Sequence, residues 1–131
     1  MFKGVDHVVI AVKDLDASVK QFEQLYGVPA TDIGEPPGAG FRNAYFRFPD
    51  SYLELVSPTS EDGPVAKRLA ASGEGTYLVA MRVDNVDETI GQLRDKGIRL
   101  LGDPGPGNPV KGQVFIHPSF AGGVLTQVVQ R

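Results

Sequence analysis

The stretch 78-LVAMRVDNVDETIGQL-93 repeats, with changed letters, the stretch 8-VVIAVKDLDASVKQF-22. Val12 and Val83 are 71 positions apart, and so are Leu15 and Val86. Each copy joins a β-branched run to apolar residues at helical spacing, which predicts a strand followed by a helix. An internal repeat of this kind indicates that one structural unit occurs twice in the chain.

The sequence around the two copies predicts the remaining elements. The predicted strands cover residues 5–12, 41–48, 52–56, 77–83, 112–117 and 124–129. The predicted helices begin at Leu15, Glu61 and Val86, and a glycine follows the end of each, at Gly27, Gly73 and Gly97. The Gly/Pro-rich stretch 102–107 predicts a loop.

This order of elements predicts an α+β fold built from two βαβββ modules. The first module covers residues 1–58, the connecting helix 59–75 and the second module 76–131, all within one domain of residues 1–131. The first of the three closing strands is poorly marked in both modules. Because neither module can bury both faces of its sheet alone, we expect the modules to pack together.

Composition excludes several classes of function. The net charge is −3 with no stripe of Lys and Arg, which argues against nucleic acid as a partner. No apolar run approaches the roughly 20 residues that span a bilayer, and no signal peptide is evident. The absence of cysteine excludes disulfides and thiol catalysis. We expect a cytoplasmic protein without a membrane partner.

Equivalent positions of the two modules carry the candidate site. The opening strands contribute His7 and Leu78, and the closing strands contribute Glu54 and Gln127. Side chains alternate along a strand, so Glu54 points away from the leucines on either side of it. We expect these four residues to surround one cleft.

Imidazole, carboxylate and amide oxygen are all ligands for a divalent metal. His7, Glu54 and Gln127 therefore form a candidate metal site, although only Glu54 brings a negative charge and Leu78 donates no lone pair. The set predicts weak or absent metal binding. His7 and Glu54 also form a candidate acid/base pair.

Four stretches carry a resemblance to a known family: 6-DHVVIAVKDLDASV-19, 53-LELVSPTSEDGPVAKRLAASGEG-75, 79-VAMRVDNVDETIGQLRDKGIRLL-101 and 115-FIHPSFAGGVLTQVV-129. The chain resembles the vicinal oxygen chelate superfamily, and most closely its methylmalonyl-CoA epimerases. The resemblance implies paired βαβββ modules that form a U-shaped metal-binding cleft, usually in a homodimer.

The resemblance also assigns positions within this cleft. It implies that His7 and Glu54 match two metal ligands, that Leu78 replaces a histidine ligand and that Gln127 replaces a glutamate ligand. The epimerases use a base carboxylate before the first hairpin, but 36-PPGAGFRN-43 contains no acid, and Glu35 lies just upstream of it. These departures argue against ordinary methylmalonyl-CoA epimerase activity.

Three further residues could touch a ligand, and a fourth is expected to be structural. Strand alternation places Tyr45 and Arg47 on one face and Arg42 on the other, so all three cannot line one cleft. We count Tyr45, Leu78 and Gln127 as candidate substrate-binding residues. His117 precedes Pro118 at a turn, where a structural role is expected.

Three functions remain open from the sequence. The first is an isomerase or lyase acting on a small carbonyl or acyl substrate, with His7 and Glu54 as acid/base groups or weak metal ligands. The second is a metal-free protein that binds a small molecule, as in resistance or sequestration, because Leu78 makes the cleft more apolar. The third is a metal-independent acid/base enzyme.

Overall fold

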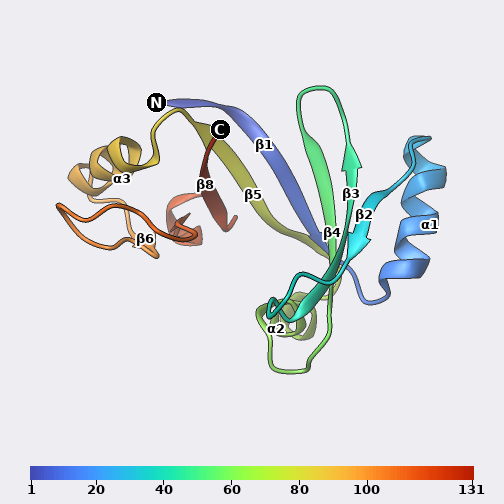
Figure 1. Ribbon diagram of the computed structural model, residues 1–131. Helices are drawn as coiled ribbons and strands as arrows, with labels where there is room; N and C mark the ends of the chain where they lie inside the picture. Colours follow the sequence, from blue (N-terminus) through green and yellow to red (C-terminus); the bar gives the residue numbers. More distant parts are fainter. The chain divides into compact units, whose positions relative to one another are not determined.

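The computed structural model describes residues 1–131, and the chain divides into two compact units. The first unit is His7–Tyr77, and the second unit combines Met1–Asp6 with Leu78–Arg131. The strand β1 (Phe2–Ala11) begins in the second unit and continues into the first (Figure 1). The α+β fold predicted from the repeat is confirmed.

The first unit follows the predicted order of strand, helix and three strands. After β1 come α1 (Leu15–Tyr26), β2 (Thr31–Gly34), β3 (Phe41–Arg47) and β4 (Tyr52–Pro58), and then the connecting helix α2 (Pro64–Ser72). Its strands lie in the order β2-β3-β4-β1, with β4 parallel to β1. Asp14 caps α1 by accepting a hydrogen bond from the Ala17 amide at 3.1 Å.

The second unit repeats this plan with shorter strands. It contains most of β5 (Gly75–Val83), α3 (Val86–Asp95), β6 (Leu100–Leu101), β7 (Phe115–Ile116), a short 3₁₀ turn at Pro118–Phe120 and β8 (Thr126–Gln130). Its strands lie in the order β5-β8-β7-β6. The poorly marked first closing strands of the two modules are therefore β2 and β6.

Several strand ends differ from the prediction by a few residues, and the largest differences concern α2 and β7. The helix α2 starts at Pro64 instead of Glu61, because proline lacks an amide hydrogen and is favoured in the first helical turn. Only Phe115–Ile116 of the predicted strand 112–117 is regular. Gly102, with φ +84°, lies against the backbone near the predicted start of this strand. A Cβ at Gly102 would clash with the Gln113 carbonyl oxygen, so the two backbones meet too closely for a side chain.

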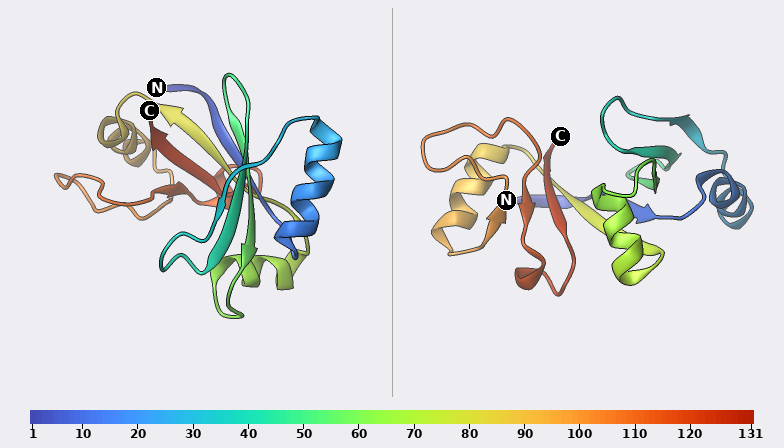
Figure 2. Two further views of the ribbon diagram at one scale, coloured as in Figure 1. Left: turned by 45° about the vertical axis from the view of Figure 1, so that its right-hand side comes forward. Right: turned by 90° about the horizontal axis from the view of Figure 1, so that it is seen from below.

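Each unit has its own hydrophobic core on the helix side of its strands. In the first unit, Leu15 and Val19 of α1 pack with Phe46 and Leu55, and Phe46 is fully buried. Figure 2 shows α1 beside the strands β3 and β4 of this unit. In the second unit, Ile90 and Leu93 of α3 pack with Val83, Val114 and Val128. The burial of Phe46 and Leu55 leaves their neighbours Tyr45 and Glu54 on the opposite face, as alternation predicts.

Strand register confirms the correspondence of the two units. Glu54 lies opposite Val9 on β1 and Tyr45 on β3. Gln127 lies opposite Ala80 on β5 and Phe115 on β7. Each of these two residues therefore occupies the same place within its own unit. No helix has the length and apolar character that crossing a bilayer requires.

Candidate functional site

The sheet face of the first unit that points away from α1 carries the main group of polar and aromatic side chains. Three strands contribute to this group, which we call the polar face: β1, β3 and β4. Its members are His7, Asn43, Tyr45, Arg47, Tyr52 and Glu54. Because side chains on neighbouring strands of one face lie close together, this face can hold reacting groups next to each other.

Asn43 connects two members of the polar face. Its side-chain Nδ2 donates to Glu54 Oε2 at 3.0 Å and to the Tyr45 hydroxyl oxygen at 3.2 Å. The Asn43 residue is only 5% exposed, whereas Glu54 and Tyr45 are half-buried. A buried amide with both hydrogens engaged fixes the positions of the carboxylate and the phenol.

Arg47 holds the ring of Tyr45 from the next position on the same face. Its guanidinium carbon lies 4.6 Å from the Tyr45 ring centroid, and its Nη2 binds Asp32 at 2.9 Å. Partial burial, followed by the nearby Glu54 charge, raises the pKa of Tyr45, while Arg47 and the Asn43 hydrogen bond oppose this shift. The phenol therefore keeps its proton at neutral pH.

His7 is packed against the aromatic ring of Tyr52. The two rings stack with centroids 4.4 Å apart and planes 9° from parallel. They are direct partners in the register between β1 and β4, and His7 is 5% exposed. Tyr52 in turn meets the Tyr45 ring at 5.5 Å in an edge contact. The imidazole thus belongs to the same ordered face as Glu54.

The equivalent positions of the second unit are mostly apolar. Leu78 on β5 is 6% exposed, and Gln127 on β8 lies between Ala80 and Phe115. Phe115 occupies the place that Tyr45 has in the first unit, so no hydroxyl faces Gln127 there. The second unit therefore has no acid/base cluster matching the polar face.

The polar face supplies two of the candidate metal donors, His7 and Glu54. A catalytic zinc site usually keeps three protein ligands, but no three His, Cys, Asp or Glu side chains come together in this chain. His7 and Glu54 supply two donors, and the Asn43 amide hydrogen occupies the approach to Glu54 Oε2. Gln127 belongs to the second unit, and its part in a metal site remains a prediction.

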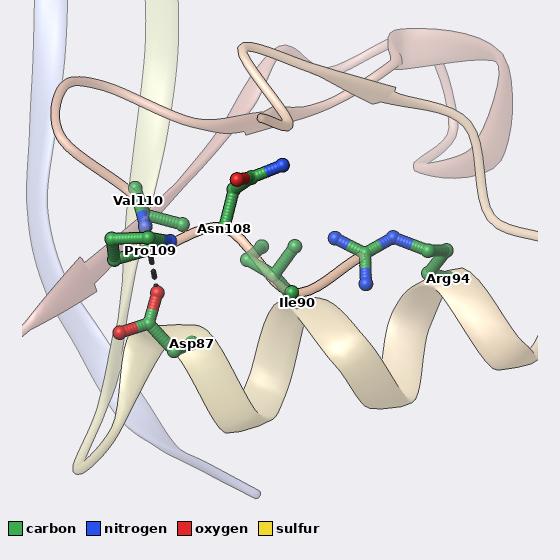
Figure 3. Close-up of a pocket in the computed structure, with 7 residues that line it drawn as sticks. Asp87, Ile90, Arg94, Asn108, Pro109 and Val110 are labelled. Atoms are coloured by element: carbon green, nitrogen blue, oxygen red, sulfur yellow. Dashed lines mark hydrogen bonds between the residues drawn. The ribbon is translucent and has the colours of Figure 1, made fainter. Parts of the chain in front are cut away.

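A separate pocket lies in the second unit between α3 and the loop 107–110. Figure 3 shows Asp87 at one end of this pocket and Arg94 at the other. Asp87 Oδ1 accepts from the Val110 amide at 2.7 Å, and Asn108 Nδ2 donates to the Pro104 carbonyl at 3.1 Å. The first contact joins the loop to α3, and the second lies within the loop.

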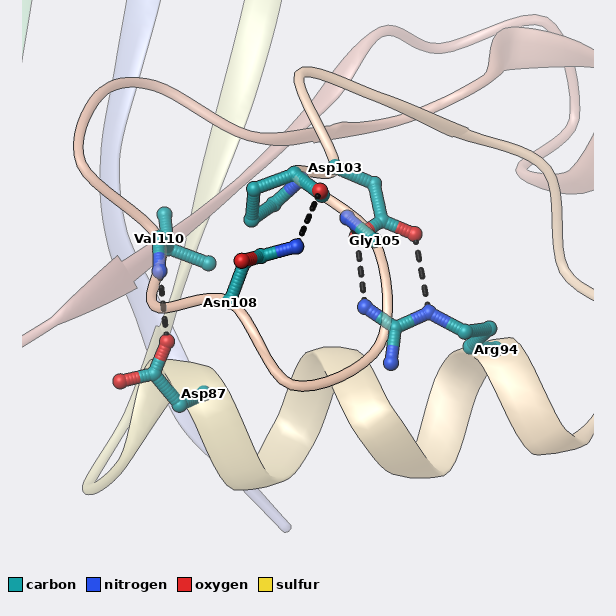
Figure 4. Close-up of polar contacts among 7 residues, drawn as sticks. Asp87, Arg94, Asp103, Gly105, Asn108 and Val110 are labelled. Atoms are coloured by element: carbon teal, nitrogen blue, oxygen red, sulfur yellow. Dashed lines mark hydrogen bonds and ion pairs between the residues drawn. The ribbon is translucent and has the colours of Figure 1, made fainter.

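Arg94 of α3 and Asp103 of the loop form an ion pair with two hydrogen bonds. The guanidinium meets both carboxylate oxygens, at 2.6 and 3.1 Å, and the same carboxylate accepts from the Gly105 amide (Figure 4). The Arg94 hydrogen bond, aided by the Gly105 amide, lowers the pKa of Asp103. We interpret this pocket as part of the loop structure, because its charged groups are already paired.

Two other residues take the roles that the sequence predicts. Arg42 points to the α1 side, where its Nη2 binds Asp16 at 3.2 Å, so it lies on the face opposite Tyr45. His117 Nδ1 accepts from the Ser119 amide at 3.1 Å and so caps the 3₁₀ turn. The structural role expected of His117 is confirmed.

Comparison with known proteins identifies the family. The sequence profile of the Glyoxalase-like domain matches residues 5–114. The chain belongs to the Glyoxalase-like family, within the vicinal oxygen chelate superfamily. Members of this family share the duplicated α+β fold described above, so the predicted resemblance is confirmed.

Several relatives within this glyoxalase-like family are methylmalonyl-CoA epimerases. The mitochondrial enzyme of Bos taurus is 31% identical over 96% of this chain and 73% of its own length. A variant of the Streptomyces coelicolor enzyme, solved in complex with 2-nitronate-propionyl-CoA, is 36% identical with a TM-score of 0.85, over 99% of this chain and 95% of that chain. The Mycobacterium tuberculosis epimerase is 32% identical with a TM-score of 0.83, over 98% and 88%.

The structure brings together some of the predicted site residues. His7, Tyr45 and Glu54 share the polar face of the first unit. Leu78 and Gln127 belong to the second unit, and their meeting with the first three residues remains a prediction. Sequence reasoning missed Asn43 and Tyr52, although strand alternation puts residues 43 and 45 on the same face.

Proposed function

We propose that this chain is an isomerase- or lyase-type enzyme that moves a proton on a small carbonyl or acyl substrate. Acyl-CoA thioesters are the first class to consider, because the relatives are epimerases and one of them was solved with a CoA thioester analogue. The single observation that supports the proposal best is the Glu54 carboxylate, which the buried amide of Asn43 holds at 3.0 Å on an otherwise ordered sheet face.

In this proposal Glu54 is the general base. The carboxylate removes the proton from the carbon next to the carbonyl, and the electron pair of that C–H bond passes into the enolate. Oε2 is engaged by Asn43, which leaves Oε1 to meet the substrate. His7, on the neighbouring strand, is the second acid/base group and delivers a proton to the intermediate.

The degenerate metal site is also part of the proposal. Leu78 and Gln127 stand where the superfamily resemblance implies a histidine and a glutamate, and a set with one carboxylate binds cations weakly. A weak site formed by His7, Glu54 and Gln127 remains the alternative. Titration calorimetry with nickel, cobalt and zinc measures this binding directly, and micromolar affinity for any of them would contradict the metal-free form of the proposal.

Solvent exchange tests the proposed activity. The protein is incubated in D2O with a panel of acyl-CoA thioesters that includes methylmalonyl-CoA, and NMR follows the loss of the α-proton. We expect exchange with at least one thioester and its loss in Glu54→Gln. Exchange at the uncatalysed rate across the whole panel would reject the enzyme proposal.

A second function is favoured by the apolar character of the second unit. Leu78, Ala80 and Phe115 suit a protein that holds a small hydrophobic compound without changing it. Thermal-shift screening separates the two proposals, because a binding protein gains stability with a compound that it does not turn over. The substrate class, a cytoplasmic location and a homodimer remain predictions of the sequence.

A further inference from the structure

The orientation of the Asn43 amide follows from its partners. An ionised carboxylate only accepts hydrogen bonds, so the group facing Glu54 Oε2 at 3.0 Å must be the NH2 group of Asn43. The same nitrogen lies 3.2 Å from the Tyr45 hydroxyl oxygen. One amide nitrogen therefore donates one hydrogen to the carboxylate and the other to the phenol.

This arrangement decides what the Tyr45 hydroxyl can do. The phenol oxygen accepts from Asn43, and its own proton is engaged in no hydrogen bond within the protein. A phenol has an ordinary pKa of about 10 and so carries this proton at neutral pH. The Tyr45 hydroxyl is therefore a donor aimed away from Asn43, next to the Glu54 carboxylate that lies directly opposite it in the sheet.

The Tyr45 ring is also held firmly enough to aim that donor. The Arg47 guanidinium covers it at 4.6 Å from the centroid, and Tyr52 meets it at 5.5 Å with planes 65° apart. Asp32 holds Arg47 in turn, at 2.9 Å. Donors fixed before the reaction stabilise developing charge better than donors that must reorient.

We infer that Tyr45 donates a hydrogen bond to the carbonyl oxygen of the substrate as it becomes an enolate, and that Asn43 is the positioning residue for both Tyr45 and Glu54. This inference rests on the proposed function. The α-proton passes to Glu54, the C–H electron pair forms the enolate double bond, and the carbonyl π electrons move to the oxygen that faces Tyr45. Return of a proton to the carbon restores the carbonyl, so no oxidant or further reactant is consumed.

Replacing Tyr45 with phenylalanine tests the donor. Tyr45→Phe keeps the ring and its packing against Arg47 and removes only the hydroxyl. We expect kcat for deuterium exchange to fall by about 100- to 1000-fold with little change in KM, as when one oxyanion donor is removed. Tyr26→Phe, the same change at the exposed end of α1, is the matched control and leaves kcat unchanged.

Affinity for an enolate mimic gives a readout independent of turnover. 2-Nitronate-propionyl-CoA, the ligand named for the Streptomyces coelicolor structure, places an anionic group beside the thioester. We expect Tyr45→Phe to lose at least tenfold in affinity for this compound and to bind propionyl-CoA as wild type does. Equal losses for both compounds would reduce Tyr45 to a general packing residue and overturn the inference.

Asn43 is tested by a change that keeps its shape. Asn43→Asp replaces the donating NH2 by a carboxylate oxygen, so neither Glu54 nor Tyr45 receives its hydrogen bond. We expect a loss of kcat as large as that of Tyr45→Phe, and a similar loss of nitronate affinity. Asn108→Asp, on the loop of the second unit, is the control. Circular dichroism establishes that each variant is folded, and a folded Asn43→Asp with wild-type kcat contradicts the positioning role.

The two levels of the proposal fail in different ways. If the wild type exchanges no acyl-CoA proton and does not bind the nitronate, the proposed function is wrong and the inference falls with it. If the wild type exchanges protons and Tyr45→Phe does so at the same rate, the function stands and only the role of Tyr45 is wrong.

Discussion

The two units share a plan but differ on the face away from their helices. Glu54 in the first unit and Gln127 in the second hold equivalent register positions. Glu54 faces Tyr45 and is held by Asn43, whereas Gln127 faces Phe115. The helix sides, by contrast, are both closed by aliphatic residues from the helix and strands.

The difference shows which part of a duplicated module is free to change. The core side must fill its volume with apolar groups to remain stable, so both units keep it. The opposite face carries little of this packing requirement and can gain or lose chemistry. In this protein His7, Tyr45 and Glu54 all lie in the first unit, and the proposed function assigns the proton transfer to that unit.

The largest effect is expected when the two equivalent polar residues, Glu54 and Gln127, are replaced one at a time. We expect Glu54→Gln to lower the rate of α-proton exchange by about 100- to 10,000-fold, the usual range for a general base. The equivalent change Gln127→Leu should reduce the rate by less than about tenfold, because Gln127 carries no charge. NMR in D2O measures both. Equal losses would mean that the two units share the chemistry.

Neighbouring residues of β3 separate stability from activity. Phe46 fills the core of the first unit, so Phe46→Ala should lower the free energy of unfolding by about 3–5 kcal/mol. Tyr45→Phe, one residue away on the polar face, should change it by less than about 1 kcal/mol. Urea denaturation followed by circular dichroism gives both values, and a reversed order would mean that the faces have been assigned wrongly.

A third change makes the first unit resemble the second. His7→Leu copies the residue found at Leu78 and removes the imidazole stacked on Tyr52. We expect about a 10- to 100-fold loss of proton exchange, because the proposed proton donor is removed. The affinity for the nitronate should fall less, because the hydrogen bond proposed from Tyr45 to the substrate oxygen is retained. His117→Leu, the same change at the histidine that caps the 3₁₀ turn, is the matched control. If His7→Leu is fully active, the imidazole has only a packing role.

The smallest expected effect concerns the loop of the second unit. Pairing with Arg94 lowers the pKa of Asp103, so this pair stabilises the fold at neutral pH and loses its contribution as pH falls through the folded-state pKa. Asp103→Asn should lower Tm modestly at pH 7, and the difference from wild type should shrink at acidic pH. Scanning calorimetry from pH 3 to pH 7 measures it. If the difference in Tm between wild type and Asp103→Asn grew as the pH fell, the ionised Asp103 carboxylate would not be stabilising the fold.

Much of the fold follows from local patterns in the sequence. The 71-residue spacing between Leu15 and Val86 located the two helices, and alternation about Glu54 placed it away from the core. The Asn43 contact could not be found in this way, because it depends on the register in which β3 pairs with β4. The His7–Tyr52 stack requires parallel pairing of strands far apart in sequence, which no local pattern specifies.

The proposed chemistry differs from that of a metal-dependent vicinal oxygen chelate enzyme in requiring no metal. The measurement is the rate of α-proton exchange in D2O for wild-type protein, with the most reactive acyl-CoA, after removal of metal with a chelator and again after addition of cobalt or zinc. We expect the same rate within about twofold in all conditions, because in the proposed mechanism Glu54 is the base and Tyr45 is the oxyanion donor. Loss of exchange with chelator and its return with metal would contradict it.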